Sequence, residues 1–169
     1  MLVLCTMFSL LTLPANATEI STIGELAQNE TAIGTYVYED MSITIAAGEP
    51  EYTDELVARS PVRIGAAYPV SFYDENMNLL FTQRFIFNID GEAGSYEFSP
   101  TVEWEFYTSY AASGVLFGGM TETRLSDTMA RHAFTWYYND AKFRTTVTFS
   151  LNPNTGSLSL YSLDNTRVY

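Results

Sequence analysis

Alternation of apolar and polar side chains is the dominant pattern along this chain. The clearest run covers residues 143–151, where Phe143, Val147, Phe149 and Leu151 alternate with Arg, Thr and Ser. Successive side chains of a β-strand point to opposite faces, so a period of two predicts a strand with one buried and one wet face. We therefore expect this segment to form an amphipathic strand.

The same alternation recurs at regular intervals. It is present in residues 41–45, 79–89, 96–106, 134–138 and 158–160. Turn-forming clusters separate these runs, namely Asp74-Glu75-Asn76, Asp90-Gly91, Asn139-Asp140 and Asn152-Pro153-Asn154-Thr155-Gly156. About eight strands joined by short turns predict an all-β fold, either a single antiparallel β-sandwich or an up-and-down β-barrel. Both architectures produce the same local pattern, so the alternatives stay open.

Three segments depart from this pattern. Thr22 and Glu25 have the spacing of a capping box, which predicts one short helix near the N-terminus. Residues 52–60 suit either a helix start or a strand. The glycine-rich residues 111–119 suit a flexible loop or a closely approached strand corner. No long crossover helix is expected, which argues against a parallel sheet.

The first 17 residues have the features of an export signal. An uncharged apolar run, Leu2–Leu13, is followed by Pro14 and the small-residue pattern Ala15-Asn16-Ala17. The run is shorter than the roughly 20 residues that span a bilayer. We expect a signal peptide at residues 1–17, a single all-β domain at 18–169, and a secreted or cell-surface location with no membrane span after cleavage. Since no Lys or Arg precedes the run, the signal is atypical or begins upstream, and an uncleaved tether or a buried strand is the alternative.

Cysteine content and charge narrow the functional classes. The only cysteine, Cys5, lies in the expected signal, which argues against a small disulfide-stapled scaffold and is more typical of bacterial export. Twenty acidic residues against eight Lys and Arg give a net charge of −12. Nucleic acid and anionic lipid are poor partners for such a surface. The charge indicates solubility or, alternatively, a cationic partner or calcium.

Two acidic patterns are candidates for catalysis or metal binding. Glu103 and Glu105 share one face of a predicted strand, roughly 6–7 Å apart at about 3.3 Å per residue. Paired carboxylates at such a separation occur in glycoside hydrolases. Glutamates that alternate along the solvent face of an amphipathic strand are, however, more often simply exposed surface residues. Asp74, Asn76 and Asn78 resemble the start of a calcium loop, but the rest of that motif is missing and a polar hairpin turn is the favoured explanation.

Metal and cofactor chemistry have little support in the sequence. His132 is the only histidine, which excludes multi-histidine metal sites, and its proximity to Ser126 and Asp127 does not establish a catalytic triad. No phosphate loop follows Gly118 and Gly119. We expect no cofactor and no metal.

Aromatic residues make up 15% of the chain and provide the remaining candidate site. Tyr107, Tyr137 and Tyr161 fall on the strand faces opposite large apolar residues, so we expect them to be exposed. Trp104 and Trp136, with Phe87 and Phe149, would line a cavity in a barrel or form the core of a sandwich. The candidate ligand contacts are Trp104, Tyr107, Trp136, Tyr137, Tyr161, Glu103 and Glu105.

These patterns favour a non-enzymatic exported domain that binds a small ligand, a glycan or a protein partner through an aromatic face or barrel mouth. The alternatives are a small secreted glycoside hydrolase using Glu103 or Glu105, and an envelope assembly module whose strand edges extend a neighbouring sheet. A cavity of roughly 300 Å³ or more would favour a small ligand, and a filled interior would favour surface recognition.

Overall fold

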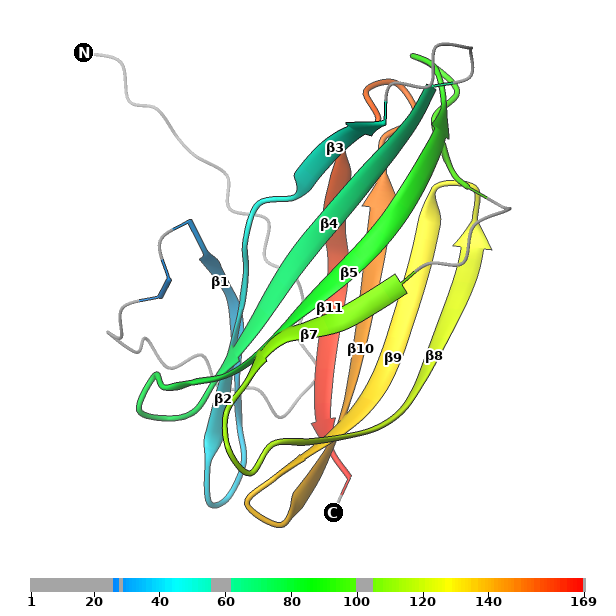
Figure 1. Ribbon diagram of the computed structural model, residues 1–169. Helices are drawn as coiled ribbons and strands as arrows, with labels where there is room; N and C mark the ends of the chain where they lie inside the picture. Colours follow the sequence, from blue (N-terminus) through cyan, green and yellow to red (C-terminus); the bar gives the residue numbers. More distant parts are fainter. Residues whose placement is uncertain (1–25, 28, 56–61, 100–104, 169) are drawn as a thin grey trace, which may run out of the picture.

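The protein is built from antiparallel β-strands, as the alternating sequence predicts (Figure 1). The computed structural model describes residues 26–27, 29–55, 62–99 and 105–168. These residues contain eleven strands and no helix. The strands are β1 (Thr31–Val37), β2 (Ser42–Ala47), β3 (Glu51–Glu55), β4 (Val62–Tyr73), β5 (Leu79–Gly91), β6 (Glu97–Phe98), β7 (Glu105–Ala111), β8 (Leu116–Ser126), β9 (Met129–Tyr138), β10 (Ala141–Leu151) and β11 (Leu158–Arg167).

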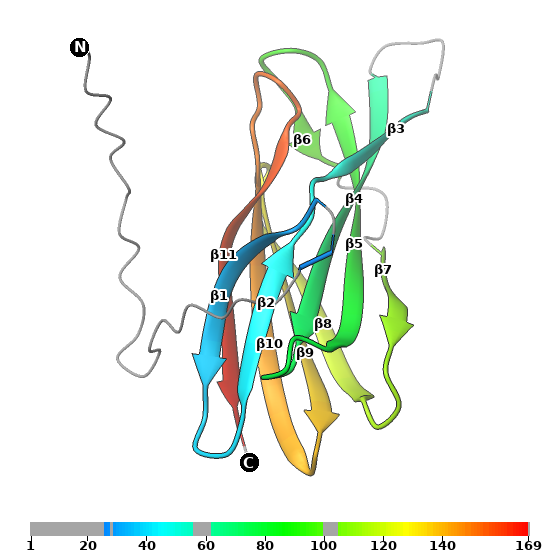
Figure 2. The same cartoon turned by 90° about the vertical axis from the view of Figure 1, so that its left-hand side faces the viewer.

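The strands form two sheets that face each other (Figure 2). The first sheet has the order β1-β2-β4-β5-β6, and β3 and β7 add to β4 and β5 where β2 and β6 do not reach. The second sheet is the meander β11-β10-β9-β8. The sheets are curled and include a half-barrel, so the all-β antiparallel class is confirmed.

Short turns join the strands where the sequence predicts them. Asn139 and Asp140 both have positive φ, 48° and 62°, as a tight two-residue hairpin requires. In the turn between β4 and β5, Asp74 Oδ1 accepts hydrogen bonds from the backbone amides of Asn76 and Asn78, at 2.9 and 2.8 Å. Asn78 Nδ2 donates to Asp74 Oδ2 at 2.9 Å. The side chain that suggested a calcium ligand therefore stabilises its own hairpin turn.

Aromatic rings fill the space between the sheets. Phe72 and Phe81 stack with centroids 4.2 Å apart, and Trp136 stacks on Phe143 at 4.3 Å. Phe149 contacts the ring of Phe85 at 5.0 Å, so the rings of the two sheets interlock. All six side chains are fully buried. Burying rings of this size removes much apolar surface from water, which is the main stabilising contribution in such a domain.

The predicted inward and outward positions agree with the structure in most strands. Ile43 and Ile45 of β2 are fully buried, and so are Phe87 and Ile89 of β5. Thr44 was expected on a wet face but is only 5% exposed. The expected signal peptide and short N-terminal helix lie outside the described residues.

Candidate functional site

The three tyrosines expected at the surface are exposed, but they do not form one face. Tyr107, Tyr137 and Tyr161 are 48%, 36% and 63% exposed. Tyr107 lies on β7 in the first sheet, and the other two lie on β9 and β11 in the second. Tyr137 pairs with Lys142 near the start of β10. Tyr161 lies beside Thr148, toward the other end of that strand. That offset amounts to roughly 20 Å at about 3.3 Å per residue.

The other predicted contact residues do not extend this surface. Trp136 is fully buried and lies in the core, the position expected for it in a sandwich. Phe87 and Phe149 are also core residues. Glu103 and Trp104 lie outside the described residues. Glu105 begins β7, but its side chain lies outside the described part of the chain.

Four other tyrosines, Tyr36, Tyr38, Tyr52 and Tyr68, have a structural role that the alternation did not reveal. Their hydroxyls reach from the first sheet to backbone groups of β11, the margin of the second sheet, where β11 has no neighbouring strand on that side among the described residues. We call these four residues the tyrosine cap. Burial raises the pKa of Tyr36 to about 12, so its hydroxyl stays protonated and able to donate at neutral pH.

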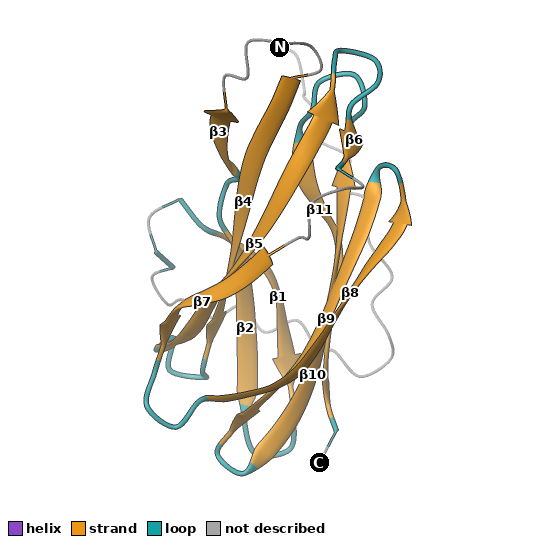
Figure 3. Cartoon of the chain, turned by 45° about the vertical axis from the view of Figure 1, so that its right-hand side comes forward, coloured by secondary structure: helices purple, strands orange, loops and turns teal. Residues whose placement is uncertain are grey.

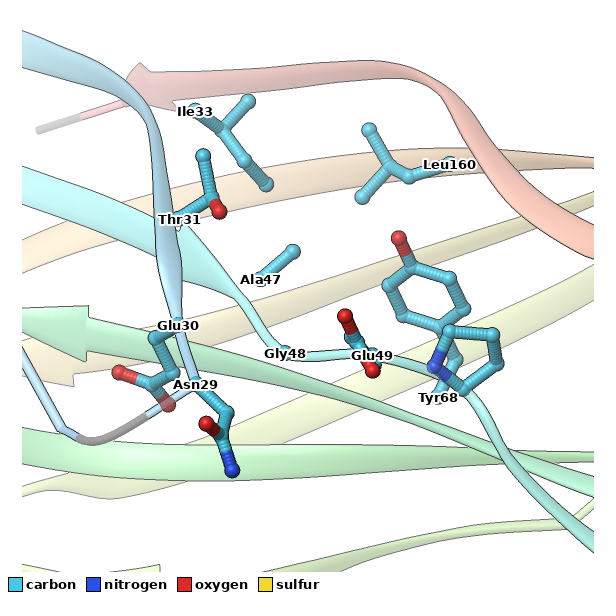
Figure 4. Close-up of a pocket in the computed structure, with 10 residues that line it drawn as sticks. Asn29, Glu30, Thr31, Ile33, Ala47, Gly48, Glu49, Tyr68 and Leu160 are labelled. Atoms are coloured by element: carbon cyan, nitrogen blue, oxygen red, sulfur yellow. The ribbon is translucent and has the colours of Figure 1, made fainter.

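The contacts of the tyrosine cap follow β11 along its length. Tyr36 and Tyr38 donate to the carbonyls of Leu163 and Asn165, each at 2.9 Å. Tyr52 accepts from the amide of Leu158 at 2.8 Å. The hydroxyl of Tyr68 points toward Leu160 (Figure 4). The cap thus satisfies edge groups that would otherwise face water or another strand.

Removing one cap hydroxyl should destabilise the protein measurably. Tyr38→Phe leaves the Asn165 carbonyl without its donor and Asn165 Nδ2, 3.0 Å from the Tyr38 hydroxyl, without its acceptor. We expect a loss of about 1–2 kcal/mol in the free energy of unfolding, measured by urea denaturation. The matched control is Tyr161→Phe, an exposed tyrosine on β11, which should change stability by less than about 0.5 kcal/mol. Equal effects of both substitutions would contradict the capping role.

A pocket of about 470 Å³ opens at this margin of the molecule (Figure 4). It lies between the contact of Tyr52 with β11 and the contact of Tyr36 with β11. The lining residues are Asn29, Glu30, Thr31, Ile33, Ala47, Gly48, Glu49, Pro50, Tyr68 and Leu160. We call it the margin pocket. It belongs to the surface between the sheets, whereas the interior is filled by rings.

Close backbone packing shapes one wall of the margin pocket. The amide of Gly48 donates to the carbonyl of Pro69 at 3.1 Å. A Cβ atom at Gly48 would lie 2.8 Å from Pro69 Cγ, closer than van der Waals contact allows. Glycine therefore permits the link between β2 and β3 to run close beside β4. This places Ala47, Glu49 and Pro50 around the opening.

The lining of the margin pocket combines negative charge with apolar surface. Glu30 accepts hydrogen bonds from Ser71 Oγ, at 2.5 Å, and from the Tyr73 hydroxyl, which fix its carboxylate. Burial and the bond to Glu30 raise the pKa of Tyr73 to about 12. Glu49 is exposed at the rim. The described lining residues include no Lys or Arg.

No motif in the sequence indicates this pocket. Its residues come from four strands, from the link between β2 and β3 and from the segment before β1, and Glu30 and Leu160 are far apart in the chain. Only the folded arrangement brings them together. The described residues hold no cluster of three or more His, Cys, Asp or Glu side chains suited to a metal ion.

Comparison with known proteins adds no candidate site. No family model, curated protein or solved structure matches the chain. Among the residues that the structure describes, there is no apolar helix of membrane-spanning length.

Proposed function

We propose that this protein is a non-enzymatic β domain, secreted or displayed at the cell surface, that binds a small amine with an apolar body in the margin pocket. The observation that carries the proposal is the pocket of about 470 Å³, lined by two carboxylates and several apolar side chains. This volume is within the range of small-molecule sites, about 300–1,000 Å³. The expected export signal at residues 1–17 supports the location.

The lining favours a cation over other ligand classes. Glu30 and Glu49 attract positive charge, and the net charge of −12 raises the local concentration of cations around the protein. Ile33, Ala47 and Leu160 offer apolar contact to the rest of the ligand. An anion would meet two carboxylates and no compensating Lys or Arg among the described lining residues. An amine attached to a hydrocarbon or aromatic group matches both features.

The rigidity of the lining also supports binding. The Tyr68 side chain is only 8% exposed, and its ring packs against Phe149 with centroids 5.3 Å apart. Glu30 is held by two hydroxyl donors. Groups that are already fixed lose little conformational freedom when a ligand binds, so more of the contact energy is retained as affinity.

A comparison of three small ligands tests the proposal. Phenethylamine, phenethyl alcohol and hydrocinnamate share an aromatic body and differ in charge. We expect phenethylamine to bind, the alcohol to bind more weakly and the carboxylate not to bind, as followed by chemical shift changes in a two-dimensional amide spectrum. The shifts should centre on the amides of residues 47–49 and of Leu160.

Glu49→Gln should weaken amine binding roughly three- to fivefold, because it removes one exposed partner charge. Glu75→Gln, in the turn between β4 and β5, changes net charge equally at an exposed carboxylate outside the pocket lining and should have no such effect. Equal binding of all three ligands, equal effects of the two substitutions, or no binding of the amine would contradict the proposal.

A further inference from the structure

Strand β8 forms the other margin of the second sheet, and it differs sharply from the capped margin at β11. Within the described residues it pairs only with β9, so its outer backbone edge has no neighbouring strand (Figure 3). Its large apolar residues Leu116, Phe117 and Leu125 are 66%, 41% and 41% exposed. An edge strand of eleven residues with exposed apolar side chains favours pairing with another strand.

The regular part of β8 is short and well defined. Irregularities in its pairing with β9 fall between Phe117 and Met120 and between Arg124 and Ser126. Residues 120–124 between them pair one to one with β9. Such irregularities twist or bend an edge and limit the length over which a second strand can pair. A second strand that pairs with β8 should therefore have a register centred within or next to residues 120–124.

The two faces of this segment carry different side chains. Met120, Glu122 and Arg124 share the face toward the core, since their partners on β9 are the buried residues Phe134, His132 and Ala130. Thr121 and Thr123 are exposed on the opposite face. Glu122 and Arg124 thus stand two positions apart on one face, with opposite charges.

This spacing makes β8 complementary to itself. If two copies of β8 pair antiparallel about Thr123, each Glu122 lies directly opposite Arg124 of the other copy. Pairing about Glu122 would instead place the two glutamates opposite each other. Opposite charges across a strand pair stabilise it and like charges destabilise it, so the charges select the register about Thr123.

The arginine retains a donor for such a contact. Arg124 Nη2 bonds Asp127 and Glu97 at 2.8 and 3.2 Å, and Nε donates to the carbonyl of Ser126. Nη1 makes no hydrogen bond within the described part of the chain. The guanidinium carries five N–H donors, so it can donate to a further carboxylate from a neighbouring copy without releasing the contacts it has.

We propose that two copies of this protein associate through β8, which pairs antiparallel with itself about Thr123 and joins the two second sheets into one. Such a contact is two-fold symmetric, so it closes as a dimer and does not propagate into a fibre. The dimer is independent of the margin pocket, which lies at the β11 margin of the same sheet.

Sedimentation velocity over a range of protein concentrations tests the association. We expect the wild-type protein to form a dimer. Glu122→Arg alone and Arg124→Glu alone should each raise the dissociation constant at least about tenfold, because each places like charges opposite each other twice in the symmetric pair. The double exchange Glu122→Arg with Arg124→Glu should restore the dimer. A wild-type monomer at every concentration, or a double exchange that fails to recover while its circular dichroism spectrum is native, would overturn the proposal.

Cysteine cross-linking tests the register without changing any charge. In a Cys5→Ser background, Thr123→Cys places two cysteines directly opposite each other across the dimer axis, so oxidation should give a covalent dimer. Thr121→Cys is the matched control, since residue 121 would face Leu125 of the other copy. Cross-linking of both variants alike, or of neither, would overturn the proposed register.

Discussion

Replacing Trp136 with alanine should reduce the free energy of unfolding by roughly 3–5 kcal/mol. The side chain is fully buried, stacks on Phe143 and meets the edges of Phe72 and Phe81, with centroids 5.6 and 4.9 Å away. Alanine would leave a cavity that these rings, held by both sheets, fill only in part. Urea denaturation, followed by tyrosine fluorescence or circular dichroism, measures the loss.

The indole of Trp136 also starts a chain of hydrogen bonds across the molecule. Its Nε1 donates to Thr145 Oγ1 at 2.9 Å, and Thr145 Oγ1 donates to Asn165 Oδ1 at 2.6 Å. Asn165 Nδ2 then donates to the hydroxyl of Tyr38, a member of the tyrosine cap. Buried polar groups in such a chain depend on one another, because each lost partner leaves another group unsatisfied.

Two further variants separate packing from hydrogen bonding at this position. Trp136→Phe keeps most of the ring but removes the N–H, so it should cost less than the alanine variant. Combined with Thr145→Val, it should show a coupling of about 1 kcal/mol in a double-mutant cycle. Tyr137→Ala, next in the chain and exposed, is the control and should cost less than about 1 kcal/mol. A similar cost for Trp136→Ala and Tyr137→Ala would contradict the core role.

The sequence identified most of the strands because one face of each is buried. On β10, Phe143, Val147 and Phe149 are fully buried, as alternation predicts, and Arg144 is exposed. Thr148 was expected on the wet face but is 3% exposed. Alternation reports which side of a strand faces the main core, whereas burial on the other side depends on neighbouring segments. Local pattern carries no information about those segments.

Neither the division into two sheets nor the margin pocket could be predicted from the local sequence pattern. The short strands β3 and β6 exist because they pair with the ends of β4 and β5, not because of their own composition. The glycine-rich residues 111–119 contain the start of β8, where Thr135 of β9 occupies the space that a side chain at Gly118 would need. Of the two alternatives for this segment, a closely approached strand corner is nearer to the structure than a flexible loop. The margin pocket combines residues with no common motif.

The tyrosines contribute to a strand edge and do not form the expected binding face. The exposed residues Tyr107, Tyr137 and Tyr161 suggested a binding face, yet they are dispersed. The half-buried Tyr36 and Tyr38 instead complete the hydrogen bonding of a strand edge. A tyrosine hydroxyl at the end of a long apolar ring can span the gap between two sheets, which a shorter polar side chain cannot. Exposure and capping cannot be distinguished from the residue type alone.

Lowering the pH should destabilise the protein through His132. This side chain is fully buried, and its ring lies against Phe85, Phe87 and Phe149, with centroids 5.0, 5.4 and 5.9 Å away. Burial lowers the pKa of His132 from 6.5 to about 4. Glu122 Oε1 lies 3.8 Å from Nδ1 of the ring. The histidine is therefore neutral in the folded protein near neutral pH.

The sign of the effect follows from the two pKa values. The unfolded chain takes up a proton near pH 6.5, whereas the folded protein does so only near pH 4. The unfolded state thus gains protons first, and the stability present above about pH 6.5 is lost as the pH falls toward about 4. A difference of this size corresponds to about 3 kcal/mol.

Urea denaturation of the wild type and His132→Met at several pH values isolates this contribution, because the carboxylates titrate in both proteins and cancel in the difference. We expect the stability of the wild type relative to the variant to fall by about 3 kcal/mol between about pH 7 and pH 4. In a Glu122→Gln background the fall should be at least as large, since the nearby carboxylate favours the protonated imidazole. Parallel pH profiles would mean that His132 takes up its proton equally in both states, which is incompatible with a ring enclosed by three phenylalanines.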